Sequence, residues 1–195
     1  MMTLYTATFA LILVMDPLGN IPLFLTILKN FDLKTQRKII IRETFIAFII
    51  LTAFLFFGKY LIEGLKITTS ALSISGAIIL FLIAIRMIFP PETSEINPQE
   101  AEEPFIVPLA VPLTAGPAAI AFVMIFVTQN PQHISILFSA VVIASLVFLF
   151  IMLLARYLMR LLGKRGLIAV ERLMGMILTA IAVQMFLTGM YAYLH

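Results

Sequence analysis

Residues 4–28 read LYTATFALILVMDPLGNIPLFLTIL, and this stretch decides the fold class. It is apolar and long enough to cross a bilayer, which takes about 20 helical residues, and the motif DPLGNIP at 16–22 interrupts it near its centre. Five further apolar segments follow at about 44–63, 67–89, 105–129, 134–158 and 168–193. We therefore expect an all-α, polytopic membrane protein with six transmembrane helices.

The composition leaves little room for anything outside the bilayer. Of the 195 residues, 62% are hydrophobic and 12% are charged, against about 25% charged in a typical soluble domain, and the mean hydropathy is +1.11. We expect a single membrane domain over residues 1–195 whose main partner is the lipid bilayer. The absence of cysteine removes disulfides and thiolate metal sites, and the net charge of +3 comes without any basic stretch interleaved with aromatic residues. We therefore expect no metal, no cofactor and no nucleic-acid binding.

The basic residues predict the orientation of the six spans. Eleven of the thirteen lysines and arginines lie on one predicted side, in the connections at 29–43 and 156–172 and at Arg86, and the exceptions are Lys59 and Lys66. The connections carry Lys29, Lys34, Arg37, Lys38, Arg42, Arg156, Arg160, Lys164, Arg165 and Arg172. Because cytoplasmic loops carry the excess of basic residues, we expect both termini on the outer side.

A proline-flanked acidic linker at about 91–103 divides the chain into a first repeat at about 1–90 and a second at about 104–195. Each half holds three spans, so two related halves would have opposite orientations in the membrane. AIRM at 84–87 matches AVQM at 182–185, and GK at 58–59 matches GK at 163–164. We expect two inverted three-helix repeats; the alternative is chance similarity between apolar helices.

The first and fourth helices are predicted to be broken. The fourth span contains PFIVPLAVPLTAGP at 104–117, whose Pro112-Leu113 aligns with Pro17-Leu18. Proline removes a backbone donor and leaves carbonyls that need partners, so such backbone must face protein or a wet cavity. Paired interruptions in inverted halves are typical of transporter substrate sites, with half-helices after Gly19 and Gly116 presenting amides to an anionic group. The alternative is that the prolines only kink the helices for packing.

The candidate substrate-binding residues all lie at these two breaks. They are Asp16, Pro17, Gly19, Asn20, Pro22, Pro112, Thr114, Gly116 and Pro117. Asp16 is an acidic residue far from the ends of its span, so it is a candidate for proton or cation coupling, and it is also a candidate N-cap with proline at N1. The two roles are compatible. Arg86 is close enough to a helix end to snorkel, and the alternative is pairing with Asp16. Arg42-Glu43 and Glu171-Arg172 fit interface positions or local ion pairs, and the alternative is a role in gating.

Other classes of function fit less well. An aspartic dyad needs two embedded carboxylates, His133 lies in a predicted loop, and His195 is terminal, so we expect no enzymatic activity. A channel would need a ring of like charges or a repeated filter sequence. The small residues Ser73, Ser75, Gly76 and Gly175 suit close helix packing.

Four blocks of sequence carry a resemblance to a known family. They are MDPLGNIPLF at 15–24, SISGAIILFLIAIRM at 73–87, EEPFIVPLAVPLTAGPAAI at 102–120 and ERLMGMILTAIAVQMFLTG at 171–189. With them the chain resembles the MarC family of multi-pass bacterial membrane proteins, which is distantly similar to the lysine-exporter superfamily. The resemblance implies a six-span protein of the bacterial plasma membrane, the inner membrane in a Gram-negative source, and favours small-molecule export without naming a substrate.

These observations lead to one hypothesis and one rival. The hypothesis is a secondary transporter or exporter of a small polar metabolite with its site at the two broken helices. The rival is a non-transporting structural or assembly component of the membrane. The sequence indicates neither the substrate nor the oligomeric state.

Overall fold

The computed structural model describes residues 3–29, 31–89 and 115–194. Regular structure in this part of the chain is helical, in the order α1 (Leu4–Met15), α2 (Ile21–Ile27), α3 (Leu33–Gly64), α4 (Thr69–Ile88), α5 (Pro117–Gln129), η3 (Pro131–His133), α6 (Ile134–Leu153) and α7 (Ala155–Leu194). The acidic linker predicted at about 91–103 and the first part of the fourth predicted span lie outside the described residues.

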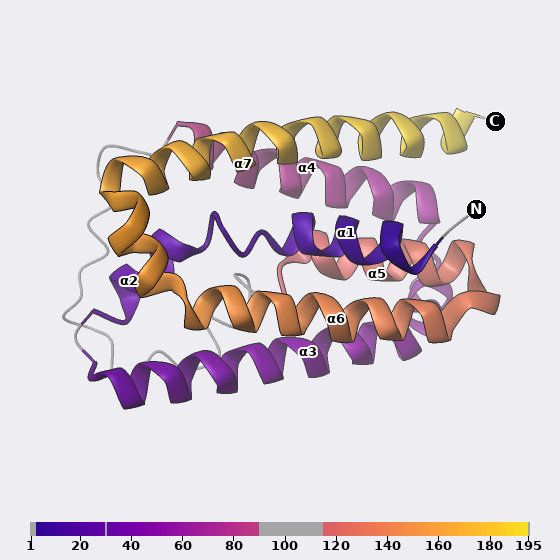
Figure 1. The fold of residues 1–195 in the computed structure, drawn as a ribbon. Coiled ribbons are helices and arrows are strands. Elements are labelled where there is room, and N and C mark those ends of the chain that lie inside the picture. The colour runs from indigo at the N-terminus through magenta and orange to yellow at the C-terminus, as the bar shows by residue number, and fades with distance from the viewer. Residues whose placement is uncertain (1–2, 30, 90–114, 195) are drawn as a thin grey trace.

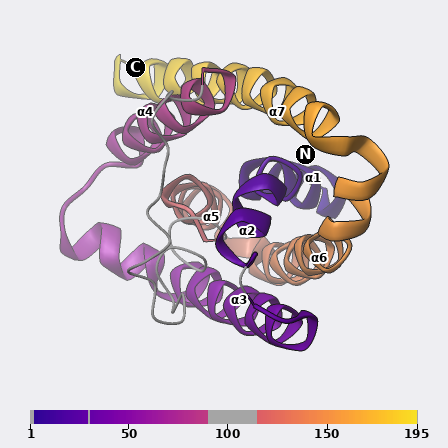
Figure 2. The same cartoon turned by 90° about the vertical axis from the view of Figure 1, so that its left-hand side faces the viewer.

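The helices run side by side in one bundle (Figure 1). Viewed from one end, the long helices α3, α4, α6 and α7 form an outer wall around the short helices α1, α2 and α5 (Figure 2). The start of α1 and the end of α7 lie at the same end of the bundle, and the starts of α3 and α7 lie at the other (Figure 1).

Four helical segments are long and apolar enough to cross a membrane: Leu33–Gly64, Thr69–Ile88, Pro131–Leu153 and Arg165–Leu194. They contain most of the spans predicted second, third, fifth and sixth. The first and fourth predicted spans contain the shorter apolar helices Leu4–Met15 and Pro117–Gln129 instead. These are too short to cross a bilayer alone, because a helix rises only about 1.5 Å per residue.

The bundle exposes large apolar side chains on its outer faces. On α3, Ala47 and Leu51 are fully buried, whereas 68% of Phe57 and 60% of Phe45 are exposed. On α6, Leu137 and Val141 are buried while 66% of Phe150 is exposed. Continuous apolar surface of this kind would be unfavourable in water and is the normal outer surface of a helix in lipid. The chain is therefore a multi-pass membrane protein.

Small residues bring α4 and α7 into close contact. A Cβ atom on Gly175 would lie 3.0 Å from the carbonyl oxygen of Ala84, and one on Gly189 would lie 3.2 Å from that of Ser70. The Ser73 hydroxyl donates a 3.0 Å hydrogen bond to the Met185 carbonyl. Close backbone approach through small residues is a usual basis of helix association in membranes, because lipid provides no hydrophobic driving force.

The packing expected of the predicted small residues holds for three of four. Gly76 of α4 faces α5, where an added Cβ would lie 2.8 Å from the Ala121 Cβ. Ser75 differs, because it is exposed and its hydroxyl donates to the Leu72 carbonyl of its own helix.

The two basic connections are more helical than predicted. Residues 33–43 form the first three turns of α3, and residues 156–172 belong to α7 except at Gly163, where φ is 67° and the helix kinks. Lysine and arginine are good helix formers, and their charged groups reach water from the end of a helix, so basic residues alone do not mark a loop. The prediction of two simple loops was wrong.

Asp32 caps the start of α3 outside the membrane-spanning segments. Its Oδ2 accepts hydrogen bonds from the backbone amides of Lys34 at 3.1 Å and Thr35 at 3.4 Å. The Thr35 side-chain hydrogen bond, helped by these amides, lowers the pKa of Asp32 below its ordinary value of 3.8. This stabilising contribution is therefore complete above the ordinary pKa and is lost as pH falls through the lowered one.

We expect Asp32→Ala to lower the Tm slightly at neutral pH, because the variant cannot accept the two amide hydrogen bonds. Below the lowered pKa, wild type and variant should unfold at nearly the same temperature. Thermal unfolding of both proteins across the acidic range checks this, and a difference in Tm that grows on acidification would contradict it.

Candidate functional site

The helical backbone is interrupted between α1 and α2. Asp16 has a left-handed backbone, with φ at 44° and ψ at 64°, and its amide still bonds to the Ile12 carbonyl at 3.0 Å. Left-handed backbone is uncommon outside glycine, although aspartate tolerates it better than most residues. The chain then turns through 17–20 before α2 begins at Ile21.

Two side chains satisfy backbone groups at this interruption. The Asp16 Oδ1 accepts a 3.1 Å hydrogen bond from the Gly19 amide. The Asn20 side-chain amide donates a 3.1 Å hydrogen bond to the Met15 carbonyl, which lies at the end of α1. Buried backbone groups left without partners are costly in a membrane, so these contacts stabilise a turn that a continuous helix would not need.

The predicted N-cap role of Asp16 was wrong in register. Asp16 is the C-cap of α1, and its carboxylate caps the amide of Gly19 within the turn. Asn20 is the N-cap of α2 and makes no side-chain cap hydrogen bond there. α2 therefore starts at Ile21, two residues after Gly19, because residues 17–20 form the turn and not the first turn of the helix.

The interruption predicted in the fourth span lies mostly outside the described residues. α5 begins at Pro117, with Gly116 as its N-cap in an extended conformation. Pro112 and Thr114 lie outside the described residues.

A cavity of about 350 Å³ lies where these elements meet. Four segments contribute to it: the interruption after α1, the last turns of α4, the start of α5 and the part of α7 beyond its kink. Its polar or backbone-exposing residues are Asp16, Gly19, Asn20, Arg86, Gly116 and Glu171, and Leu80, Ile83, Met87 and Leu178 are among its apolar ones. This volume is within the range of small-molecule sites, about 300 to 1,000 Å³.

The cavity brings together part of the predicted set. Asp16, Gly19, Asn20 and Gly116 line it. Pro17 is buried in the turn, and neither Pro17, Pro22 nor Pro117 is among the lining residues. The interruption between α1 and α2 and the start of α5 therefore reach one cavity through residues beside their prolines.

Two lining residues were missed as site residues. Arg86 was interpreted as a snorkelling side chain and Glu171 as an interface residue, yet both line the cavity with Asp16. The sequence signal for a functional role was a charged residue within an apolar span. The prediction gave more weight to the position of Arg86 and Glu171 near helix ends, where a charged side chain normally reaches water.

The cavity offers binding groups of both signs. Asp16 and Glu171 supply carboxyl groups, Arg86 supplies a guanidinium and Asn20 supplies an amide. Asp16 is 5% exposed, so a ligand that reaches it is largely shielded from water. Electrostatic interactions are stronger in such a place than they are in water. Among the described residues, no group of three His, Cys, Asp or Glu side chains is placed to hold a metal ion.

Comparison with known proteins gives consistent matches. The model of the MarC family integral membrane proteins matches residues 1–194. The chain is 46% identical over 188 residues to a UPF0056 membrane protein of Buchnera aphidicola subsp. Schizaphis graminum, covering 96% of each chain. It is 46% identical over 185 residues to the UPF0056 inner membrane protein YhgN of Escherichia coli K12, covering 94% of each.

More distant relatives also align over most of their length. A UPF0056 membrane protein of Chlamydia pneumoniae is 35% identical over 175 residues, covering 89% of this chain and 87% of that protein. No solved structure matches the chain.

Proposed function

Because this chain belongs to the MarC family of integral membrane proteins, we propose that it is a secondary transporter that exports a small polar metabolite through the cavity at Asp16. The observation that carries the proposal is that the interruption after α1 and the start of α5, about a hundred residues apart in sequence, line one cavity that also holds charged groups of both signs. Interrupted helices that meet at a polar cavity are the usual form of a substrate site in secondary transporters.

The packing of the helices supports two inverted repeats. In related halves, the segment α1–α2 corresponds to the fourth span ending in α5, α3 corresponds to α6, and α4 corresponds to α7. If the halves are related, the contact of α1 with α6 should have a counterpart between α5 and α3. Both contacts are observed. The pairs α3 with α6 and α4 with α7 exchange into themselves, and both pairs pack together. We infer a pseudo-two-fold arrangement of six spans, with the first and fourth broken.

The charges of the two ends support the proposed orientation. The basic residues at the start of α3, at the end of α4 and around the kink of α7 lie at one end of the bundle, and Lys59 and Lys66 lie near the other. By the excess of basic residues on the cytoplasmic side, the termini face outward. In a Gram-negative cell this places the protein in the inner membrane.

Each group in the cavity has a proposed role. Arg86 and the start of α5 attract an anionic group of the substrate, and the carboxyl groups attract a cationic group or a coupling ion. Asp16 couples transport to a proton or cation, because a buried carboxylate is costly in an apolar environment unless a proton or cation neutralises it. The proposal involves no chemical conversion of the substrate.

The test compares the small-molecule contents of cells and medium for three strains: wild type, deletion and Asp16→Asn. We expect the deletion to retain at least one polar metabolite that wild type exports, and Asp16→Asn to resemble the deletion. The matched control is Asp32→Asn, which makes the same chemical change outside the cavity and should resemble wild type.

Abundance and Tm of the Asp16→Asn protein in membranes exclude loss of fold as the cause. Identical metabolite profiles in all strains would overturn the proposal and favour the rival function, a non-transporting structural or assembly component.

A further inference from the structure

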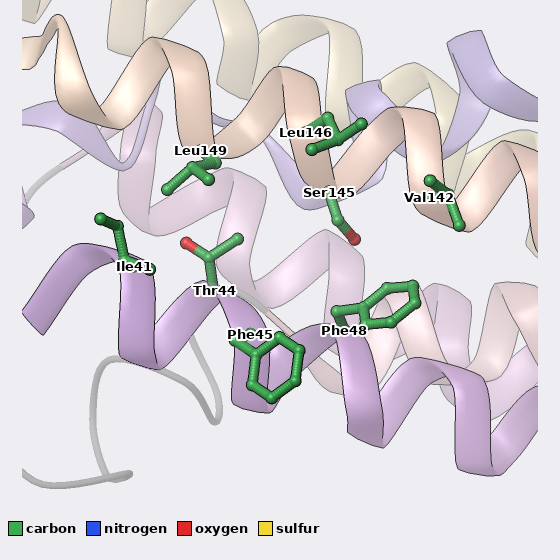
Figure 3. Close-up of a pocket in the computed structure, with 8 residues that line it drawn as sticks. All are labelled: Ile41, Thr44, Phe45, Phe48, Val142, Ser145, Leu146 and Leu149. Atoms are coloured by element: carbon green, nitrogen blue, oxygen red, sulfur yellow. The ribbon is translucent and has the colours of Figure 1, made fainter. Parts of the chain in front are cut away.

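A second hollow lies on the lipid-facing side of the bundle between α3 and α6 (Figure 3). It has a volume of about 240 Å³, and its walls are apolar. It is lined by Ile41, Phe45 and Phe48 of α3 and by Val142, Leu146 and Leu149 of α6. Phe45 is 60% exposed and Leu146 is 59% exposed, so this groove opens towards the surrounding lipid.

Two buried hydroxyl groups lie between the same helices. Thr44 is 4% exposed and Ser145 is 6% exposed, and both line the groove (Figure 3). Within the described part of the chain neither hydroxyl oxygen has a hydrogen-bond partner. Both hydroxyl oxygens are themselves buried and closed off from the groove, so the open surface of the groove is formed by apolar atoms.

The groove leads to the basic end of the bundle. Arg37 and Lys38 precede Ile41 by four and three residues in α3, so they lie one turn before it on the same side of the helix. Both side chains are exposed. An anionic group at the membrane surface would meet them directly above the groove.

A third cation is held at this end by a buried glutamine. Arg156 of α7 donates a 2.9 Å hydrogen bond from Nε to Oε1 of Gln36. The Gln36 side-chain amide in turn donates to the carbonyls of Leu28 at 2.6 Å and Phe31 at 2.9 Å, which fixes the oxygen that Arg156 uses. Because only Nε is used in this contact, the remaining N–H groups of the guanidinium can bind a phosphate.

We propose that the groove binds an anionic phospholipid. The phosphate lies at Arg37, Lys38 and Arg156, and one acyl chain follows the apolar walls of the groove. Eleven residues separate Arg37 from Phe48, which is about 16 Å along a helix, close to the roughly 15 Å depth of one leaflet of the hydrocarbon core. A basic cluster beside a groove between transmembrane helices is suited to an acidic lipid headgroup.

The sequence allows a direct test by fluorescence, because it contains no tryptophan. Phe45→Trp places a single reporter at the edge of the groove, and Phe150→Trp places one on an exposed lipid-facing site of α6 next to Leu149. Each protein is reconstituted in phosphatidylcholine vesicles that contain equal fractions of either brominated phosphatidylglycerol or brominated phosphatidylcholine. Bromine quenches tryptophan only at close contact, so quenching reports which lipid occupies the site.

We expect brominated phosphatidylglycerol to compete for the Phe45→Trp site about fivefold or more better than brominated phosphatidylcholine, since one basic residue near the surface contributes about 1 kcal/mol. The Phe150→Trp reporter should show no such preference. Added to the Phe45→Trp protein, the double substitution Arg37→Gln and Lys38→Gln should remove most of the preference, and so should Arg156→Gln. The matched change at the other end, Lys59→Gln with Lys66→Gln, should leave it intact.

Equal quenching by the two lipids at the Phe45→Trp site would overturn the proposal, as would a preference that survives the Arg37 and Lys38 substitutions. The Tm of each variant in the same vesicles shows that it is folded. If Arg156→Gln lowers the Tm, the Arg37 and Lys38 variant, whose side chains are exposed, decides the result.

Discussion

Replacing Gly175 by leucine is expected to destabilise the protein strongly. Even a Cβ at this position would lie 2.9 Å from Cγ1 of Ile88, 3.0 Å from Cβ of Met87 and 3.0 Å from the carbonyl oxygen of Ala84. The oxygen belongs to the backbone of α4, so it cannot turn away as the end of a flexible side chain can. The leucine must push α4 and α7 apart, and overpacking of this kind typically costs about 1 to 3 kcal/mol, occasionally more.

The measurement is the Tm of the purified protein in detergent, together with its yield from membranes. Gly175→Ala should lie between wild type and Gly175→Leu. Gly64→Leu is the matched control, because a Cβ there meets nothing within 4 Å. Similar Tm values for the two leucine variants would show that close approach of α4 and α7 does not support the fold.

Reversing the charge at Arg86 is expected to reduce the proposed export at least tenfold while the protein stays folded. Arg86 is an exposed residue in the last turn of α4 and lines the cavity with Asp16 and Glu171. Arg86→Glu would place a third carboxyl group there and leave no described cationic side chain on its wall. Because each 1.4 kcal/mol corresponds to tenfold in binding, we expect export to fall at least tenfold through repulsion of the substrate's anionic group.

The matched control is Arg165→Glu, which makes the same charge change on an exposed residue that does not line the cavity. The measurement is the rate of efflux of the metabolite that distinguishes wild type from the deletion strain. Equal loss in both variants would indicate a general effect of charge on insertion. Undiminished efflux in Arg86→Glu would remove this residue from the site.

Much of the local structure was predictable from short-range physics. The apolar segments predicted the membrane-crossing parts of the long helices but not the basic ends of α3 and α7, because about 20 apolar residues need a lipid environment and a hydrogen-bonded backbone. The motif at 16–22 predicted an interruption of the first span, and α1 does end at Met15, just before it. The exact start of α2 at Ile21 depended on how the turn at 17–20 closes, which the sequence pattern does not specify.

The composition of the cavity was only partly predictable. Asp16, Gly19, Asn20 and Gly116 stood out because they lie beside prolines within apolar segments, and they line the cavity. Arg86 and Glu171 did not, because each lies near a helix end, where a charged residue normally reaches water. Their meeting with Asp16 follows from the close packing of α4 along α7.

The sequence by itself determined that this chain spans a membrane, where its helices are interrupted and which end of the bundle is basic. These properties depend on residues within a few turns of each other and on the difference between lipid and water. The tertiary structure alone decided that Arg86 and Glu171 share a cavity with Asp16, and that an apolar groove between α3 and α6 ends at Arg37 and Arg156. Which helices become neighbours depends on how closely glycine and other small side chains allow helices distant in sequence to approach. This depends on both helices of a pair and cannot be inferred from either segment alone.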